Sequence, residues 1–340
     1  MAGRDRCPRG IPAARLSGSP RGRPGDDDRP GGRSRGVASA ELGGLRIIYS
    51  PGYFADLGGH VFPIQKYRLV HERLLREGVI APAAVLEPQP APLEDLLLVH
   101  TPAYVQDLLT QTRSPRTMFS EMPLTLPIVE AFRLATGGTI LAAEQALERQ
   151  AAVNLGGGLH HAFPDHAEGF CYFNDVAIAI RRLERAGRIR RSLVVDCDLH
   201  QGNGTAFIFR NDPAVFTFSV HQENLYPVKQ TGDLDIGLDD FAGDEEYLDA
   251  LRRTLPGVFR DFRPDLVFYV AGADPYGGDQ LGTLQISLPG LCARDEFVLE
   301  LCRKHQAPVA VVLAGGYAEK TEDTITIHVN TCRVAAALFT

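Results

Sequence analysis

Residues 194–204 read VVDCDLHQGNG, an apolar start followed by side chains that can bind a metal ion. Residues 192–195 are mostly apolar and β-branched, which is typical of a buried strand. Asp196, Asp198 and His200 follow at a spacing of two, and alternate side chains of an extended backbone share a face. Two carboxylates beside an imidazole are unfavourable unless a cation or strong donors lie between them. The pattern therefore favours a metal site over the alternative, a helix N-cap, because a cap uses only one acceptor.

The chain has 340 residues, of which 44% are hydrophobic, enough for one large α/β domain or two smaller ones. No apolar run approaches the ~20 residues that cross a bilayer, so we expect no membrane contact. The six cysteines are scattered and form no C-x-x-C pair, which argues against a disulfide framework and a thiolate zinc site. We therefore expect a reducing, cytoplasmic location.

Residues 1–36 contain nine Arg and four Asp with abundant Gly and Pro, a composition that cannot form a core. We expect a disordered tail over residues 1–44 and a catalytic domain over residues 45–340. Segment 1–36 has a charge of +5 (nine minus four), so the remaining chain carries −7 − 5 = −12. An acidic body favours cationic substrates and argues against direct binding of nucleic acid.

Apolar strands alternate with amphipathic helices along the rest of the chain. We expect strands at residues 45–50, 96–99, 152–155, 192–195, 215–220, 266–270 and 309–313. We expect helices over residues 65–77, 102–109, 128–147, 174–186, 245–262, 294–304 and 324–338. This alternation predicts a single α/β domain with a central parallel β-sheet flanked by helices.

Five of the predicted strands end in polar, glycine-rich turns. In chain order the turns read GGGLHH, DCDLHQGNG, SVH, AGADP and AGGY. Ligands of open α/β sheets bind outside the carboxyl ends of the strands, so these turns should meet at one rim.

The turn residues suggest hydrolytic chemistry. Asp274 is the natural third metal ligand, and three protein ligands leave one position for water, as in catalytic zinc sites. Its alternative role is a turn residue. His160 and His161 are adjacent, so one could act as general base and the other could tune charge, with structural histidines as the alternative. Tyr317 could stabilise an oxyanion, or be an ordinary turn tyrosine.

The chain resembles the histone deacetylase family, whose fold is the arginase-deacetylase fold. The resemblance spans about residues 45–340 and rests on five motifs in family order: GGGLHHAFPDHAEGFCYFND, DCDLHQGNG, SVHQENLYP, AGADPYGGDQLG and LAGGY. The motif wording is nearest the bacterial and class IV branch, which shares SVHQENLYP and a terminal DTITIHVNT stretch.

The resemblance implies a role for each residue of the rim. One zinc ion per chain would be bound by Asp198, His200 and Asp274. The catalytic group would contain the general base and acid His161, its electrostatic neighbour His160, their partners Asn203 and Asp196, and Tyr317, which polarises the substrate carbonyl. The acyl-lysine tunnel would be lined by Gly169, Phe170, Tyr226 and Leu281. A structural potassium ion would be bound by Ser219 and by main-chain oxygens of Asp196, Asp198, His200 and Val220.

Two positions depart from related patterns. Asn203 stands where class I enzymes have Asp, and a neutral partner should make His161 less basic. Gly202 stands where arginases have the Asp that binds their second metal, so the sequence predicts one metal rather than a dinuclear manganese site.

These features predict a zinc-dependent amidohydrolase that removes acetyl or longer fatty acyl groups from lysine side chains by metal-activated water. The expected partner is an acyl-lysine protein or peptide. Two alternatives remain: hydrolysis of acetylated polyamines, which are also cationic, and non-catalytic recognition of acyl-lysine. The glycine-containing loop over residues 52–63, together with the fatty-acyl preference of some class IV enzymes, predicts higher efficiency on longer acyl chains.

Overall fold

The computed structural model of the protein describes residues 44–339. In this range eight strands form one sheet in the order β2-β1-β3-β8-β7-β4-β5-β6. All neighbouring strands are parallel, as the sequence predicts. The strands are β1 (Arg46–Ile48), β2 (Val85–Leu86), β3 (Ala151–Asn154), β4 (Ser192–Asp196), β5 (Val215–Gln222), β6 (Leu234–Leu238), β7 (Leu266–Val270) and β8 (Val309–Val312). Except for Gly44, the predicted tail lies outside the described residues.

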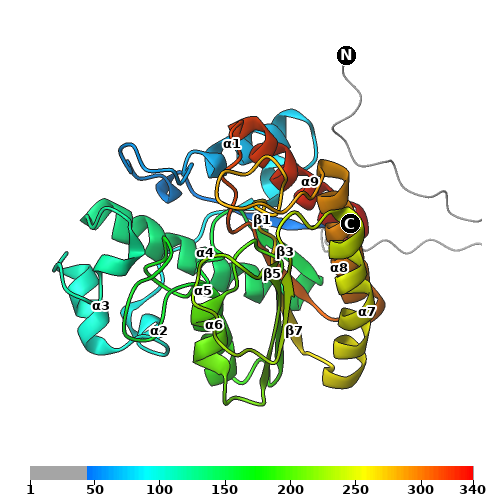
Figure 1. The fold of residues 1–340 in the computed structure, drawn as a ribbon. Coiled ribbons are helices and arrows are strands. Elements are labelled where there is room, and N and C mark those ends of the chain that lie inside the picture. Colours follow the sequence, from blue (N-terminus) through cyan, green and yellow to red (C-terminus); the bar gives the residue numbers. More distant parts are fainter. Residues whose placement is uncertain (1–43, 340) are drawn as a thin grey trace, which may run out of the picture.

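Helices cover both faces of the sheet (Figure 1). The helices are α1 (Lys66–Arg76), α2 (Leu93–Leu96), α3 (Pro102–Leu109), α4 (Leu126–Arg149), α5 (Asp175–Arg185), α6 (Asn203–Phe209), α7 (Asp244–Phe262), α8 (Leu288–Lys304) and α9 (Thr321–Phe339). Figure 1 shows α4, α5 and α6 on one side of the strands and α7 and α8 on the other. The first and last helices, α1 and α9, pack together although they come from opposite ends of the domain.

The expected strand at residues 96–99 is wrong. Leu96 ends α2, and residues 97–99 form a turn. Pro92 before the helix and two acidic residues in its first turn favour a helix start. The buried carboxylate of Asp95 also binds Arg182 and Arg185 of α5, which fixes α2 against the domain.

The glycines inside α4 are explained by close contacts. A Cβ atom on Gly137 would lie 1.8 Å from the backbone oxygen of Gln89, and one on Gly138 would lie 2.0 Å from the Tyr53 hydroxyl. At Gly137 the neighbouring atoms belong to the backbone of another segment, so the helix and that segment pack closely. By length and composition α4 is the one helix among the described residues that could cross a membrane, but 67% of its apolar window is buried inside the domain.

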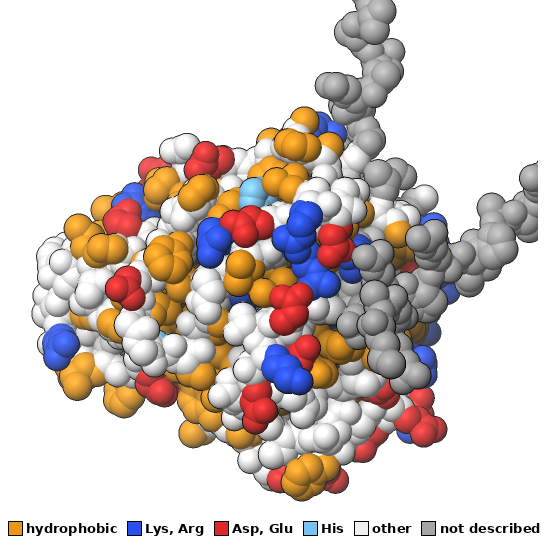
Figure 2. All heavy atoms as spheres, turned by 90° about the horizontal axis from the view of Figure 1, so that it is seen from above, with side chains coloured by type: hydrophobic (Ala, Val, Ile, Leu, Met, Phe, Trp, Pro, Cys, Tyr) orange, Lys and Arg blue, Asp and Glu red, His pale blue; other side chains and the backbone are white. Residues whose placement is uncertain are grey.

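The strands that carry the five polar turns are neighbours in the sheet. They occupy consecutive positions in the order β3, β8, β7, β4 and β5. Their carboxyl ends lie at one edge because the strands are parallel. On the part of the face that Figure 2 shows in colour, positive and negative side chains lie next to one another and apolar side chains form separate groups.

Candidate active site

The potential metal ligands lie at the carboxyl ends of the adjacent strands β4 and β7. The ligand atoms of Asp198, His200 and Asp274 lie within 4.8 Å of one another, and all three residues are buried. His200 Nδ1 is 3.3 Å from Asp198 Oδ1 and 3.4 Å from Asp274 Oδ2. The sequence-predicted ligands are therefore brought together from two strands.

The surroundings of these ligands fit a cation. Asp274 Oδ2 is buried and has no hydrogen-bond partner among the described residues. Burial and the charge of Asp198 raise the pKa of Asp274, so the carboxylate pair is unfavourable without a positive charge between its members. A Cβ atom on Gly315 would lie 2.1 Å from Asp274 Oδ2, so the glycine keeps this space open. Two carboxylates and one imidazole are a ligand set that suits zinc.

The tandem histidines follow β3 and reach the potential metal ligands across the rim. His160 Nδ1 lies 2.7 Å from Asp196 Oδ2, and His161 Nδ1 lies 2.8 Å from Asn203 Oδ1. These are the two pairings that the family resemblance implies. The two imidazoles also meet, with 3.0 Å between their Nε2 atoms.

The two histidines have opposite electrostatic environments. Burial alone would lower the pKa of His160, but the carboxylates of Asp196 and Asp198 raise it to about 9. Burial and the nearby charges of His160 and His200 lower the pKa of His161 far below its ordinary value. His160 is therefore the charged member of the pair at neutral pH, and His161 is neutral.

Tyr317 lies in the turn after β8, beside the metal ligands. Its backbone N–H donates to Asp279 Oδ2 at 2.6 Å, and its ring packs edge-on against Phe62 and Phe170. Burial and the nearby carboxylates raise the pKa of Tyr317 well above its ordinary value, so the phenol remains a hydrogen-bond donor at neutral pH.

A cavity of about 200 Å³ leads to this centre. It is lined by Glu121, His161, Gly169, Phe170, His200, Leu225, Tyr226, Leu281 and Tyr317. All four predicted tunnel residues line it, and Glu121 and Leu225 are lining residues that the sequence analysis missed. Gly169 has φ +51°, and a Cβ atom there would lie 2.5 Å from the His161 ring, so the position requires glycine.

Two more charged residues of the site were missed. Glu168 accepts hydrogen bonds from Asn203 Nδ2 at 2.8 Å and from the Tyr226 hydroxyl at 3.1 Å. Lys66 is completely buried, and its Nζ donates to the backbone oxygen of Ala314 at 2.5 Å. The only sequence signal for Glu168 was its place inside a quoted motif. Lys66 gave no signal beyond its position at the start of a helix.

The predicted potassium ligands lie under the same rim. Ser219 of β5 is the direct neighbour of Asp196 of β4 in the sheet register, and Val220 follows it. The Ser219 hydroxyl lies 2.8 Å from His221 Nδ1.

Comparison with known proteins shows the family to which the chain is similar. The histone deacetylase domain family matches residues 60–332 of the chain. An uncharacterized protein of Picosynechococcus is 44% identical over 288 residues, which cover 84% of this chain and 96% of that protein. Histone deacetylase 2 of Arabidopsis thaliana is 33% identical over 299 residues, with 84% and 77% covered. The crystal structure of an HDAC homolog from Aquifex aeolicus superposes with a TM-score of 0.76 at 25% identity, covering 86% of this chain and 84% of that one.

Proposed function

Because the chain belongs to the histone deacetylase family, we propose that it is a zinc-dependent hydrolase that removes acyl groups from lysine side chains. One observation carries the proposal. The two histidines of opposite character, Tyr317 and two potential metal ligands, Asp198 and His200, line one small cavity, and the third potential ligand, Asp274, lies beside Asp198 and His200. Amide hydrolysis needs these functions together: activation of water, a base and an oxyanion donor.

Each residue has a task in the proposed reaction. Asp198, His200 and Asp274 would hold the zinc, which when bound lowers the pKa of water and polarises a carbonyl group. His161 takes a proton from the attacking water at Nε2 and later gives one to the leaving lysine nitrogen. The Tyr317 hydroxyl donates a hydrogen bond to the developing oxyanion.

The remaining pair, His160 and Asp196, would provide a positive charge beside His161. His160 is held by Asp196 and stays positively charged beside His161. This charge opposes protonation of His161 before reaction, which keeps its lone pair available at neutral pH. The bond from water oxygen to the acyl carbon forms, the C–N bond breaks, and the products are a carboxylate and a free lysine amine.

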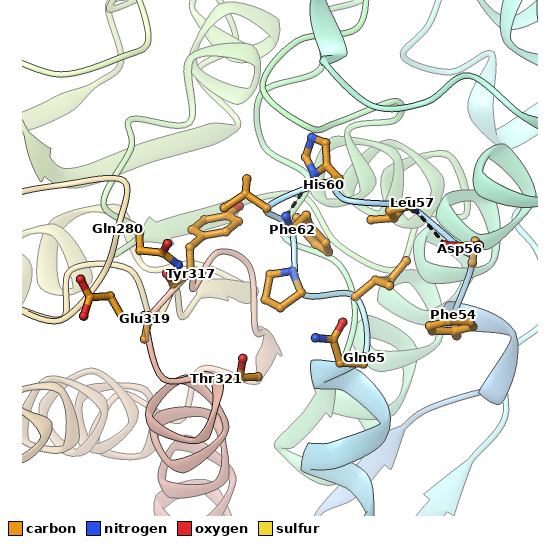
Figure 3. Close-up of a pocket in the computed structure, with 16 residues that line it drawn as sticks. Phe54, Asp56, Leu57, His60, Phe62, Gln65, Gln280, Tyr317, Glu319 and Thr321 are labelled. Atoms are coloured by element: carbon orange, nitrogen blue, oxygen red, sulfur yellow. Dashed lines mark hydrogen bonds between the residues drawn. The ribbon is translucent and has the colours of Figure 1, made fainter.

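We place the preference for acyl groups longer than acetyl at a second cavity beside Tyr317. This cavity of about 360 Å³ is lined mainly by the loop before α1, including Leu57, Phe62 and Ile64. Figure 3 shows Phe62 beside Tyr317, so these two side chains separate the cavity from the catalytic centre. Rotation of Phe62 would join the two spaces. Each methylene buried there would contribute ~0.8 kcal/mol.

A second candidate substrate is an acylated polyamine. Glu121 is the one carboxylate among the residues lining the 200 Å³ cavity, and a carboxylate there would attract the second amine of a polyamine. The same carboxylate would also accept main-chain N–H groups of a peptide. Comparison of both substrate classes in one assay decides between them.

We also propose a structural potassium ion at Ser219, Val220 and the main-chain oxygens of Asp196, Asp198 and His200. Support comes from the neighbouring positions of Asp196 and Ser219 in the sheet. Exchange of potassium for sodium should lower the melting temperature if the site is used.

The test is a screen of the purified, zinc-loaded protein against acetyl-, octanoyl- and myristoyl-lysine peptides and acetylated polyamines. We expect peptide deacylation, with kcat/KM higher on medium or long chains than on acetyl. A kcat/KM that falls steadily with chain length would leave a plain deacetylase. Faster cleavage of polyamines would reassign the substrate, and tight binding without turnover would indicate a non-catalytic reader of acyl-lysine.

A further inference from the structure

His161 lies inside a chain of hydrogen bonds that has a carboxylate at each end. Asp196 accepts from His160 at one end, and Glu168 accepts from Asn203 at the other. Between them, His160 Nε2 faces His161 Nε2, and His161 Nδ1 faces Asn203 Oδ1. Every link needs one donor and one acceptor, and a carboxylate can only accept. The Glu168 end therefore fixes the direction of the two links to Asn203, and a neutral His161 then accepts at Nε2 from His160.

The amide group of Asn203 is the link that could reverse. Its oxygen and its NH2 group have nearly the same shape but opposite hydrogen-bonding character. Because Glu168 Oε1 lies 2.8 Å from it, the NH2 end must face Glu168. The oxygen then faces His161, whose Nδ1 must carry the proton. A reversed amide would present NH2 to Nδ1 and move the ring proton to Nε2, toward the N–H of His160.

We propose that Glu168 is a positioning residue that selects the protonated nitrogen of His161 by orienting the amide of Asn203. With the proton on Nδ1, Nε2 is an acceptor, which faces His160 in this structure and would accept the proton of water in the proposed reaction. The consequence for catalysis rests on the proposed function, whereas the hydrogen-bond pattern does not.

Glu168 is itself held firmly. Its backbone N–H donates to Cys171 at 3.3 Å and its carbonyl accepts from Cys171 at 2.9 Å, which closes a tight turn. The Tyr226 hydroxyl donates to the same carboxylate oxygen that Asn203 contacts, and His166 Nε2 lies 3.5 Å from the other oxygen. Burial raises the pKa of Glu168, but hydrogen bonds from His166, Asn203 and Tyr226 bring it below its ordinary value. The group is a carboxylate at neutral pH.

The contact with Glu168 also bears on the role of the neutral residue Asn203. An aspartate there would orient His161 and supply negative charge with one side chain. Here Asn203 provides the acceptor, and Glu168 provides the charge one hydrogen bond farther from the imidazole. The two functions are divided between two residues from different segments of the chain.

The test compares E168Q, N203D and the double variant E168Q/N203D with the wild type. The glutamine in E168Q can face Asn203 with either end, so the amide loses its single orientation. We expect kcat on an acyl-lysine peptide to fall at least about tenfold, the usual cost of losing such a partner, with KM nearly unchanged. N203D alone should also lose activity because it places a second carboxylate next to that of Glu168.

Rescue in the double variant separates positioning from a general structural role. In E168Q/N203D the new amide donates to the new carboxylate, which presents only acceptors to His161 Nδ1. We expect kcat to return to within about threefold of the wild type. Asp165→Asn is the control. Asp165 contacts His166, so this substitution removes one negative charge nearby and leaves the contacts of Asn203 unchanged. Wild-type kcat in E168Q, or losses that multiply in the double variant, would overturn the proposal.

A second readout keeps this inference distinct from the proposed function. Nitrogen-15 NMR of labelled histidine, with His161 assigned by its substitution, reports which ring nitrogen is protonated. We expect Nδ1–H in the wild type and a mixture in E168Q, whether or not the protein is active. If the wild type cleaves no acylated amine, the proposed function fails; if the wild type and E168Q show the same His161 protonation, the role of Glu168 fails.

Discussion

Single atoms decide the chemistry at the centre of the site. In the proposed reaction the Tyr317 hydroxyl donates a hydrogen bond to the developing oxyanion. Tyr317→Phe should lower kcat by about 10²–10³, the usual cost of one oxyanion donor, with little change in KM because the bond is made in the transition state. The control is Tyr276→Phe, which removes a hydroxyl bonded to Asp323 instead. Near-normal turnover in Tyr317→Phe would leave Tyr317 as a turn residue.

The metal ligands make a second prediction at this scale. We expect elemental analysis to find one zinc per chain in the wild type and little in His200→Ala, because losing one of three ligands weakens binding strongly. His305→Ala is the matched control, since His305 lies at the end of α8 away from the site. Equal metal content in wild type and His200→Ala, or two metals per chain, would contradict the assignment.

Sequence reasoning found residues of the site that follow strand ends and missed those placed by tertiary contacts. Asp198, His200 and Asp274 could be predicted because each lies within four residues of the end of a buried strand. Glu168 and Lys66 could not, because their partners Asn203 and Ala314 lie 35 and 248 residues away in sequence. No local pattern records such a contact.

Among the elements, α4 shows packing overriding helix propensity. Gly→Ala inside a helix normally stabilises by about 1 kcal/mol. At Gly137 the added Cβ would meet the Gln89 oxygen, so we expect Gly137→Ala to destabilise by about 1–2 kcal/mol, as overpacking does. Gly257 in α7 has no atom closer than 3.7 Å to an added Cβ, so Gly257→Ala should stabilise. Denaturant unfolding measures both, and a stabilised Gly137→Ala would refute the argument.

The errors among the elements have physical causes as well. The strands that went unpredicted, β2 and β6, are the two edges of the sheet, and β2 has only two residues. Edge strands need not be apolar along their length, so their pattern is weak. The strand expected at residues 96–99 has enough apolar residues, but its capping signals and the ion pairs of Asp95 stabilise a helical turn instead.

At the scale of the whole molecule, stability should depend on buried His100. Its Nδ1 donates to the Phe163 carbonyl, and its Nε2 accepts the N–H of Asn174. Burial lowers the pKa of His100 to about 4, although its contacts with backbone groups raise it slightly. As pH falls from about 6.5 to 4, His100 becomes protonated in the unfolded chain but stays neutral in the folded protein. This difference lowers the free energy of unfolding by about 3 kcal/mol.

The measurement is denaturant unfolding at pH 7, 5.5 and 4.5 for the wild type and His100→Gln. The variant should be less stable at pH 7, since it changes two buried hydrogen bonds. Its further loss of stability on acidification should be smaller than in the wild type. Parallel pH profiles for the two proteins would show that another group controls acid unfolding.

The position of β8 also affects how the protein can be made. This strand, residues Val309–Val312, lies between β3 and β7 although it is the last strand of the sheet to be synthesised. Until the ribosome has released it, β3 and β7 each expose an open edge, and open edges pair with other chains. The nascent chain must therefore be made as far as residue 312 before its sheet can close. A chain that stopped before residue 309 would lack a central strand of the sheet rather than an edge strand.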